Sequence, residues 1–237
     1  MNTLKMSQKL TIVLDLDGTL VETAPDLINA HNHVMKKFGF KTMYENDIKK
    51  LVGKGASSLI TRSVWGQAQK NIKKIDDDKT KKEMVKEFID YYSKNICVES
   101  KLLNGVENFL KWSKKNNISL GVCTNKQQYL AEDLLKEIKI NNYFEYVAGS
   151  NTFDYCKPDP RHLTNVIEIM QGDVKKSIMI GDSETDSETA RSAGVPFILV
   201  ENGYTEKTTS EIHHDYLIKD FIGIEEIIRK YFIINID

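Results

Sequence analysis

Short runs of apolar and β-branched residues alternate with longer amphipathic stretches over most of the chain. Such a run is typical of a strand that is buried on both faces of a parallel sheet. The runs that predict strands lie at 10–14, 118–123, 143–148, 177–180, 196–200 and 216–218. Between them, apolar residues recur at helical spacing. Strands that alternate with helices predict an α/β fold built on a doubly wound, mainly parallel, Rossmann-like sheet.

One long segment interrupts this alternation. After the first strand, and up to about residue 99, the apolar positions recur only at helical spacing. The helices expected there lie at about 23–38, 45–52, 56–65 and 76–95. We therefore predict two units: an α/β core formed by residues 1–20 and 100–237, and an all-helical cap formed by residues 21–99.

Composition and charge exclude several classes of partner. Lys and Arg number 33 against 34 Asp and Glu, and a net charge of -1 gives no basic field for nucleic acid or an anionic membrane. No apolar run is long enough to span a bilayer or to form the core of a signal peptide. The three cysteines are too scattered for a disulfide framework, and the five histidines lack zinc-site spacing and are expected mainly at the surface. We expect a cytoplasmic protein whose anionic ligand is held by local positive charges.

Polar residues follow the first predicted strand directly. Asp15 and Asp17 stand two apart, and Gly18 and Thr19 then allow the chain to turn close to a ligand. Carboxylates at the end of a buried strand are costly unless a cation or a function holds them, and ligands bind at that end in open α/β sheets. Alone, Asp-x-Asp-Gly is also an ordinary strand-to-turn boundary, so its meaning depends on the other strand ends.

Two further predicted strands also end in polar side chains. Thr124 and Asn125 follow the strand at 118–123, while Asp182 and Ser183 follow a later one. A Lys-Pro-x-Pro loop after another strand carries a lysine that can reach the same edge. Singly, these residues could be helix caps, turn residues or a plain loop lysine. Together, at the carboxyl ends of parallel strands, they are expected to converge on one crevice.

These side chains suit a magnesium ion and a phosphate group. Mg²⁺ prefers oxygen ligands and typically takes one or two carboxylates, which Asp15 and Asp182 would supply. Lys157 and Thr124 are of the types that stabilise phosphoryl oxygens during transfer. A carboxylate nucleophile forms an aspartyl-phosphate, and Asp17 would act as acid for the leaving oxygen and as base for the hydrolytic water.

Four motifs in this chain resemble those of a known family. They are Asp-Leu-Asp-Gly-Thr-Leu at 15–20, Thr-Asn-Lys at 124–126, Lys-Pro-Asp-Pro at 157–160 and Gly-Asp-Ser-x-x-Asp at 181–186. With the helical insertion after the first of them, the chain resembles the haloacid dehalogenase superfamily. Within that superfamily it is most similar to the phosphoglycolate phosphatases. The resemblance implies a Mg²⁺-dependent phosphatase that acts on a small anionic phosphate ester.

The resemblance also implies roles for single residues. It implies Asp15 as the nucleophile and Asp17 as the acid and base. The residues implied to bind the substrate phosphate are Thr124, Asn125 and Lys157. The groups implied to hold Mg²⁺ are the Asp15 carboxylate, the Asp17 carbonyl and Asp182. The residues implied to lie just outside these ligands are Asp186 and Ser183.

The predicted cap carries one further similarity. Gly53, Lys54 and Gly55 belong to a segment that resembles the Gly-x-Gly-Ala loop with which these phosphatases close over the substrate, so we expect them to bind substrate. Such a loop offers backbone N–H groups at a helix start, which suits the carboxylate of phosphoglycolate. The chain departs from the family pattern at Glu22-Thr23, where relatives usually have Asp-Ser.

Several alternatives stay open at this point. The same chemistry could serve pyrophosphate, a nucleotide or a sugar phosphate, or the chain could be a phosphosugar mutase. A catalytically idle binding protein is disfavoured, because a pure phosphate binder would gain by losing the charges of Asp15 and Asp17. A dehalogenase is also disfavoured, because it would not need the second acid, Asp17. The sequence does not decide between a monomer and a homodimer.

Overall fold

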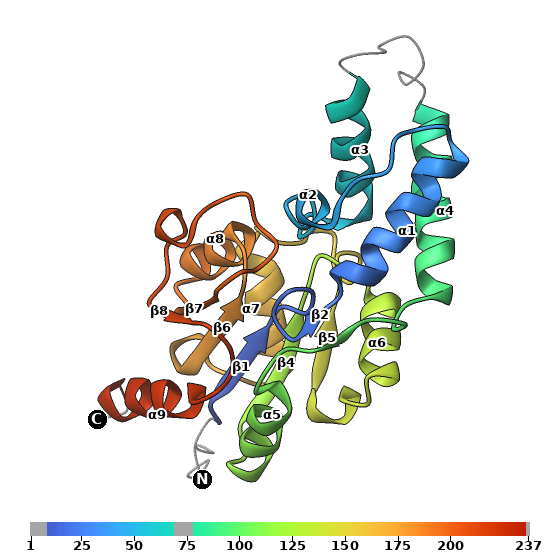
Figure 1. Ribbon diagram of the computed structural model, residues 1–237. Coiled ribbons are helices and arrows are strands. Elements are labelled where there is room, and N and C mark those ends of the chain that lie inside the picture. Colours follow the sequence, from blue (N-terminus) through green and yellow to red (C-terminus); the bar gives the residue numbers. More distant parts are fainter. Residues whose placement is uncertain (1–8, 69–77, 236–237) are drawn as a thin grey trace.

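The computed structural model describes residues 9–68 and 78–235. Its main feature is a six-stranded, fully parallel sheet in the order β5-β4-β1-β6-β7-β8 (Figure 1). The strands are β1 (Thr11–Leu14), β4 (Ser119–Cys123), β5 (Tyr146–Ala148), β6 (Ser177–Gly181), β7 (Phe197–Val200) and β8 (Tyr216–Ile218). The predicted α/β fold with a parallel, doubly wound sheet is confirmed.

Strand β1 lies in the middle of the sheet. It pairs with β4 on one side and with β6 on the other, with Leu14 opposite Val122 and Ile180. All four of its residues are buried, which explains a continuous apolar run in place of an alternating pattern. Residues that follow β1 therefore lie at the carboxyl end of the sheet, near its middle, where ligands bind in this class of fold.

Helices cover both faces of the sheet. One face packs against α5 (Val106–Lys115), α6 (Gln128–Glu137) and α9 (Ile224–Asn235). The other packs against α7 (Pro160–Ile169) and α8 (Glu184–Ala193). Neighbouring strand residues divide between the two cores, so Ile12 and Leu14 face the first group of helices and Val13 the second.

Four further helices lie in the chain between β2 and β3, as predicted. They are α1 (Ala24–Lys37), α2 (Glu45–Lys49), α3 (Gly55–Ala68) and α4 (Asp78–Lys94). Figure 1 shows them grouped beyond one end of the sheet, where α4 packs against α1 and α3. The predicted start of the last one, at Asp76, lies outside the described residues. No helix in the described ranges is both long and apolar enough to span a membrane.

Two very short strands are absent from the sequence prediction. β2 (Val21–Glu22) and β3 (Lys101–Leu102) form an antiparallel pair where the chain enters and leaves the helical segment. A two-residue strand is too short for alternating polarity to appear in a sequence. The pair joins the segment that enters the helical region to the segment that leaves it. The assignment of residues 21–99 to a separate cap stays a prediction.

Candidate active site

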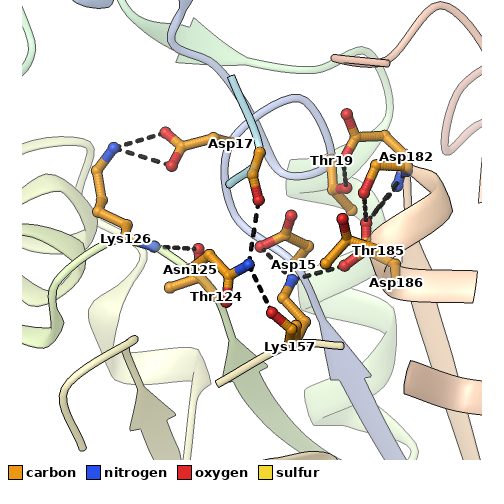
Figure 2. A network of polar contacts seen from close by, with 12 residues as sticks. Asp15, Asp17, Thr19, Thr124, Asn125, Lys126, Lys157, Asp182, Thr185 and Asp186 are labelled. Carbon is orange, nitrogen blue, oxygen red and sulfur yellow. Dashed lines mark hydrogen bonds and ion pairs between the residues drawn. The ribbon is translucent and has the colours of Figure 1, made fainter. Parts of the chain in front are cut away.

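The carboxyl ends of β4, β1 and β6 bring the predicted side chains together (Figure 2). Thr124, Asp15 and Asp182 each follow one of these strands directly. Because the three strands are neighbours in a parallel sheet, residues more than a hundred positions apart in sequence converge there. The Asp15 N–H still donates to the Ile180 carbonyl at 2.9 Å, so the sheet pairing fixes the backbone of Asp15 itself.

Three carboxylates meet at this edge. Asp15, Asp182 and Asp186 are buried, and each places an oxygen within 4.8 Å of the others. The ammonium of Lys157, also buried, lies 3.0 Å from Asp15 Oδ1 and 2.5 Å from Asp186 Oδ1. The lysine therefore joins the carboxylate at the end of β1 to the one on α8.

Burial dominates the electrostatics of this cluster. It raises the pKa of Asp15 to about 6, although the charge of Lys157 acts in the opposite direction. Burial, together with Asp186 and Asp15, raises the pKa of Asp182 well above its usual value. Burial alone would lower the pKa of Lys157, but the two carboxylates beside it raise that pKa above the ordinary lysine value. The lysine thus stays charged, while the neighbouring carboxylates disfavour each other's ionised form.

The charge balance of the cluster fits a divalent cation. Within the described residues, three carboxylates face the single ammonium of Lys157, which pairs with Asp15 and Asp186. A hard cation with a preference for oxygen ligands would neutralise this excess of negative charge. Asp15 and Asp182, the carboxylates predicted to hold Mg²⁺, are therefore suitably placed to do so.

Two residues that sequence reasoning passed over hold Asp182 in position. Thr19 Oγ1 donates to Asp182 Oδ1 at 2.9 Å, and the Tyr204 N–H donates to Asp182 Oδ2 at 2.6 Å. A Cβ atom on Gly203 would lie only 2.3 Å from that of Asp182, so a larger residue does not fit there. Thr19 belongs to the first motif and could have been assigned, whereas Tyr204 lies in a loop without any motif.

Asp186 and Ser183 form the beginning of α8. Asp186 Oδ2 accepts hydrogen bonds from the Ser183 N–H at 3.1 Å and the Ser183 hydroxyl at 2.7 Å. Its other oxygen binds Lys157. Asp186 therefore orients the lysine and the loop that carries Asp182, which suits the predicted place of both residues just outside the metal ligands.

Asp17 has a different set of partners. Lys126 Nζ donates to its two carboxylate oxygens at 2.7 and 2.9 Å, and Thr23 Oγ1 donates to Oδ1 at 2.7 Å. The Lys126 ammonium also lies 4.6 Å from the centre of the Tyr92 ring, a cation–π contact. Sequence reasoning quoted Lys126 within the Thr-Asn-Lys motif but gave it no role, so the signal was present and was missed.

Thr124 and Asn125 form the turn after β4. The Thr124 hydroxyl oxygen accepts from the Lys126 N–H at 3.2 Å. The Asn125 side-chain amide donates to the Lys157 carbonyl at 3.0 Å and to the Gly53 carbonyl at 3.2 Å. The structure therefore gives Asn125 a role in joining three loops, and its predicted role in substrate binding stays a prediction.

The loop before α3 closes over the same edge. Gly53 and Gly55 have φ values of +91° and +81°, which favour glycine, and Lys54 Nζ lies 3.3 Å from Glu184 Oε1 on α8. A cavity of about 240 Å³ lies between this loop, α4 and the strand ends. The predicted site residues that line it are Asp15, Asp17, Gly53, Lys54, Gly55, Thr124 and Asn125. The remaining four, Lys157, Asp182, Ser183 and Asp186, belong to the buried cluster.

Comparison with known proteins decides the family. The family model described as haloacid dehalogenase-like hydrolase matches residues 12–200, a span that contains all four motifs. The chain belongs to this hydrolase family. The resemblance on which the sequence-based expectations depended is thereby confirmed.

Curated relatives extend over nearly the whole of this hydrolase. It is 37% identical over 224 residues to a phosphoglycolate phosphatase of Caulobacter vibrioides, with 94% of this chain and 92% of that protein covered. It is 35% identical over 210 residues to a phosphoglycolate phosphatase of Mesorhizobium japonicum, with 89% and 90% covered. A solved structure of a predicted phosphoglycolate phosphatase from Haemophilus somnus matches with a TM-score of 0.87 at 28% identity, covering 94% of this chain and 99% of that one.

The Glu22 that departs from the family pattern lies at the joint between β2 and α1. Tyr204 Oη donates to Glu22 Oε1 and accepts from the Thr23 and Ala24 N–H groups, each at 2.8 Å. Lys49 Nζ lies 3.3 Å from Glu22 Oε2. In this hydrolase the longer acid thus connects α2, the start of α1 and the loop that holds Asp182.

The expectation that the histidines lie mainly at the surface is wrong for two of them. His31 and His162 are fully buried. His162 Nδ1 accepts from the Lys157 N–H at 3.1 Å, so this histidine anchors the backbone of the lysine loop. Burial, together with the nearby Lys157 charge, lowers the pKa of His162 to about 4. His162 is therefore neutral near pH 7 and serves as a structural acceptor in this hydrolase.

Proposed function

We propose that this protein is a Mg²⁺-dependent phosphomonoester hydrolase that acts on 2-phosphoglycolate through an aspartyl-phosphate. The observation that supports it most directly is the arrangement around Asp15. This buried carboxylate lies 3.0 Å from the Lys157 ammonium and within 4.8 Å of the Asp182 carboxylate, and a second acid, Asp17, follows two residues later. A nucleophile, a cation for phosphoryl oxygens and a separate acid are the groups that phosphoryl transfer through an enzyme carboxylate requires.

In the first step, an Asp15 carboxylate oxygen attacks phosphorus and the bond from phosphorus to the ester oxygen breaks. Lys157 stabilises the negative charge on the phosphoryl oxygens, assisted by the Thr124 hydroxyl. Asp17 gives its proton to the leaving oxygen, so that an alcohol departs. The products of this step are phosphorylated Asp15, the Asp17 carboxylate and glycolate.

In the second step, Asp17 takes a proton from water, and the resulting hydroxide attacks phosphorus. The bond between phosphorus and the Asp15 oxygen breaks, which releases inorganic phosphate and restores both acids. Lys126 and Thr23 donate hydrogen bonds to the Asp17 carboxylate and so orient it. One acid can therefore serve both steps: it first donates a proton to the leaving oxygen and then accepts a different proton from the attacking water.

Mg²⁺ would be held by Asp15, Asp182 and the Asp17 carbonyl. When bound, it supplies positive charge that offsets the repulsion between the carboxylates and the substrate phosphate. Thr19 and Tyr204 keep Asp182 oriented for this role. Asp186 binds both Lys157 and Ser183, and it thereby positions the lysine and the loop that carries Asp182.

The choice of 2-phosphoglycolate is supported by relatives that carry the name phosphoglycolate phosphatase and match this chain over about nine tenths of its length. We propose that Gly53, Lys54 and Gly55 close over this substrate, because they line the cavity opposite Asp15. The substrate is small and anionic, and neither nucleic acid nor a membrane takes part in the proposed reaction. We propose a monomer or a homodimer.

A substrate panel tests the proposal. Phosphate release is measured with Mg²⁺ for 2-phosphoglycolate, pyrophosphate, a nucleoside monophosphate and a hexose phosphate, and kcat/KM values are compared. Asp15→Asn protein serves as the control for contaminating phosphatase. We expect 2-phosphoglycolate to give the highest kcat/KM, by roughly 10-fold or more. A higher value for any other substrate, or isomerisation of the hexose phosphate without phosphate release, would refute the substrate assignment.

A further inference from the structure

The cavity carries a buried positive charge, that of Lys126, which has no proposed contact with the substrate. Lys54 and Lys126 are the lysines among its described lining residues. The Lys54 side chain is 45% exposed and pairs with Glu184 on α8, whereas the Lys126 side chain is 5% exposed. Because a charge in a dry site interacts much more strongly with an anion than a solvated one does, Lys126 is the better candidate for a recognition group.

The position of Lys126 relates it to the leaving group. Its ammonium donates to both oxygens of Asp17, the acid proposed to protonate the leaving oxygen. Figure 2 shows Lys126 on the side of Asp17 away from Asp182, which places the acid between the lysine and the metal-binding carboxylate. The organic part of a phosphate ester begins at the leaving oxygen, so it enters the cavity on the Asp17 side. Lys126 is then the cation that this part meets.

The surroundings of Lys126 make this end of the cavity selective. Phe88, Leu130 and Leu27 line the same cavity and are almost fully buried, so the cavity wall is largely apolar. Tyr92 also lines it, lies against the Lys126 ammonium, and has a buried hydroxyl without a hydrogen-bond partner among the described residues. The Lys126 ammonium, set against the Tyr92 ring on an apolar wall, forms a small site for a second anionic group.

Asp17 can tolerate a shared lysine. Its Oδ1 also accepts a hydrogen bond from the Thr23 hydroxyl at 2.7 Å. The carboxylate therefore keeps this partner when the lysine shares its N–H donors with a ligand. An ammonium has three N–H donors on a flexible stem, and it can therefore contact Asp17 and a second carboxylate together.

Building on the proposed function, we propose that Lys126 recognises the carboxylate of the substrate and makes the enzyme selective for phosphate esters that carry a second anion close to the phosphate. The charge for this recognition then comes from the core turn after β4. The cap loop at Gly53, Lys54 and Gly55 would contribute closure and backbone contacts.

The test uses a pair of substrates that differ in one charge. 2-Phosphoglycolate is compared with its carboxamide, phosphoglycolamide, which has nearly the same shape and is neutral at that end. We expect the wild type to prefer the acid, and Lys126→Met to reduce the acid-to-amide ratio of kcat/KM by roughly 10- to 100-fold, the usual effect of a charge-assisted hydrogen bond. Any general disturbance of Asp17 lowers kcat/KM for both substrates by the same factor, so it cancels in this ratio.

Lys54→Met is the matched variant, because it removes the other lysine from the same cavity. It is expected to retain the wild-type ratio of acid to amide. An unchanged ratio in Lys126→Met, or loss of the preference in Lys54→Met, would overturn the proposal. Hydrolysis of neither compound by the wild type would instead refute the proposed substrate, so the two failures are distinguishable.

A second pair of variants guards against misfolding, since Lys126→Met leaves a largely buried carboxylate without its cation. Asp17→Asn and the double variant Asp17→Asn, Lys126→Met both lack the carboxylate charge, and both turn over slowly. Calorimetric titration with phosphoglycolate and phosphoglycolamide gives the binding preference directly. We expect Asp17→Asn to bind the acid more tightly than the amide and the double variant to lose that difference. Equal preferences in the two proteins would contradict the role of Lys126.

Discussion

The buried histidine beneath the lysine loop should make the protein sensitive to acid. His162 has a pKa of about 4 in the folded protein, against 6.5 for an unperturbed histidine. Below pH 6.5 the unfolded chain therefore binds a proton that the folded protein does not bind until the pH approaches 4. The stability that the neutral histidine provides is fully present above pH 6.5 and is lost as the pH falls toward 4.

The size of this effect follows from the two pKa values. A complete shift of this kind corresponds to about 1.4 kcal/mol per pKa unit. Between about pH 7.5 and about pH 4.5, the His162 contribution to the free energy of unfolding is expected to fall by about 2.5 kcal/mol. The raised pKa values of Asp15 and Asp182 act in the opposite direction, because a carboxyl that is held neutral by burial stabilises the folded protein as the pH falls. A backbone hydrogen bond at Gly149 and the charge of Asp159 raise the pKa of His162, and the value of about 4 already includes both.

A matched variant separates His162 from these other groups. In His162→Asn the amide oxygen takes the place of Nδ1 as acceptor for the Lys157 N–H, and the side chain does not titrate. Urea unfolding of both proteins at about pH 7.5 and about pH 4.5 gives two differences in the free energy of unfolding. We expect the wild type to lose about 2.5 kcal/mol more than the variant. A difference below about 1 kcal/mol would refute the assignment of a buried, neutral His162.

Three further outcomes follow from the site and its supports. Excess EDTA should abolish turnover and added Mg²⁺ should restore it, because the negative charge of three carboxylates and a phosphate exceeds the single positive charge of Lys157. Undiminished activity in EDTA would contradict this. Asp17→Asn should lower kcat by roughly 10²- to 10⁴-fold through loss of proton transfer, with a smaller loss excluding Asp17 as the acid. Asp26→Ala should lower the free energy of unfolding by about 2–4 kcal/mol, because the Asp26 carboxylate accepts from the Val98, Glu99 and Ser100 N–H groups; a loss below about 1 kcal/mol in urea unfolding would refute it.

Residues at strand ends could be located from the sequence because two regular patterns coincide there. A buried strand is visible as an apolar run, and a polar residue that follows it must lie at the ligand-binding edge of a parallel sheet. Asp15, Thr124 and Asp182 were placed in this way, and the structure brings them together. Lys157 was placed by its motif, and it lies against Asp15 as that reasoning requires.

Residues that act through loops could not be located in the same way. Tyr204 holds Asp182 by its backbone and the start of α1 by its hydroxyl, yet its loop has neither periodicity nor motif. His162 lies on the buried face of α7, where its spacing matches that of the apolar residues beside it. The partners of such residues depend on which loops the fold brings together, and a pattern along one chain does not contain that information. Lys126 is the exception, because it belongs to the Thr-Asn-Lys motif and its charge alone suggests an acidic partner at the same strand ends.

The central claim is that phosphate passes through Asp15, and trapping of the phosphoenzyme tests it most directly. Enzyme with Mg²⁺ is mixed with 2-phosphoglycolate carrying labelled phosphate, quenched in acid within one turnover, and digested for peptide mapping. We predict label on the peptide that contains Asp15, and none in Asp15→Asn protein treated in the same way. Label on any other residue, or label that persists in Asp15→Asn, would contradict this mechanism.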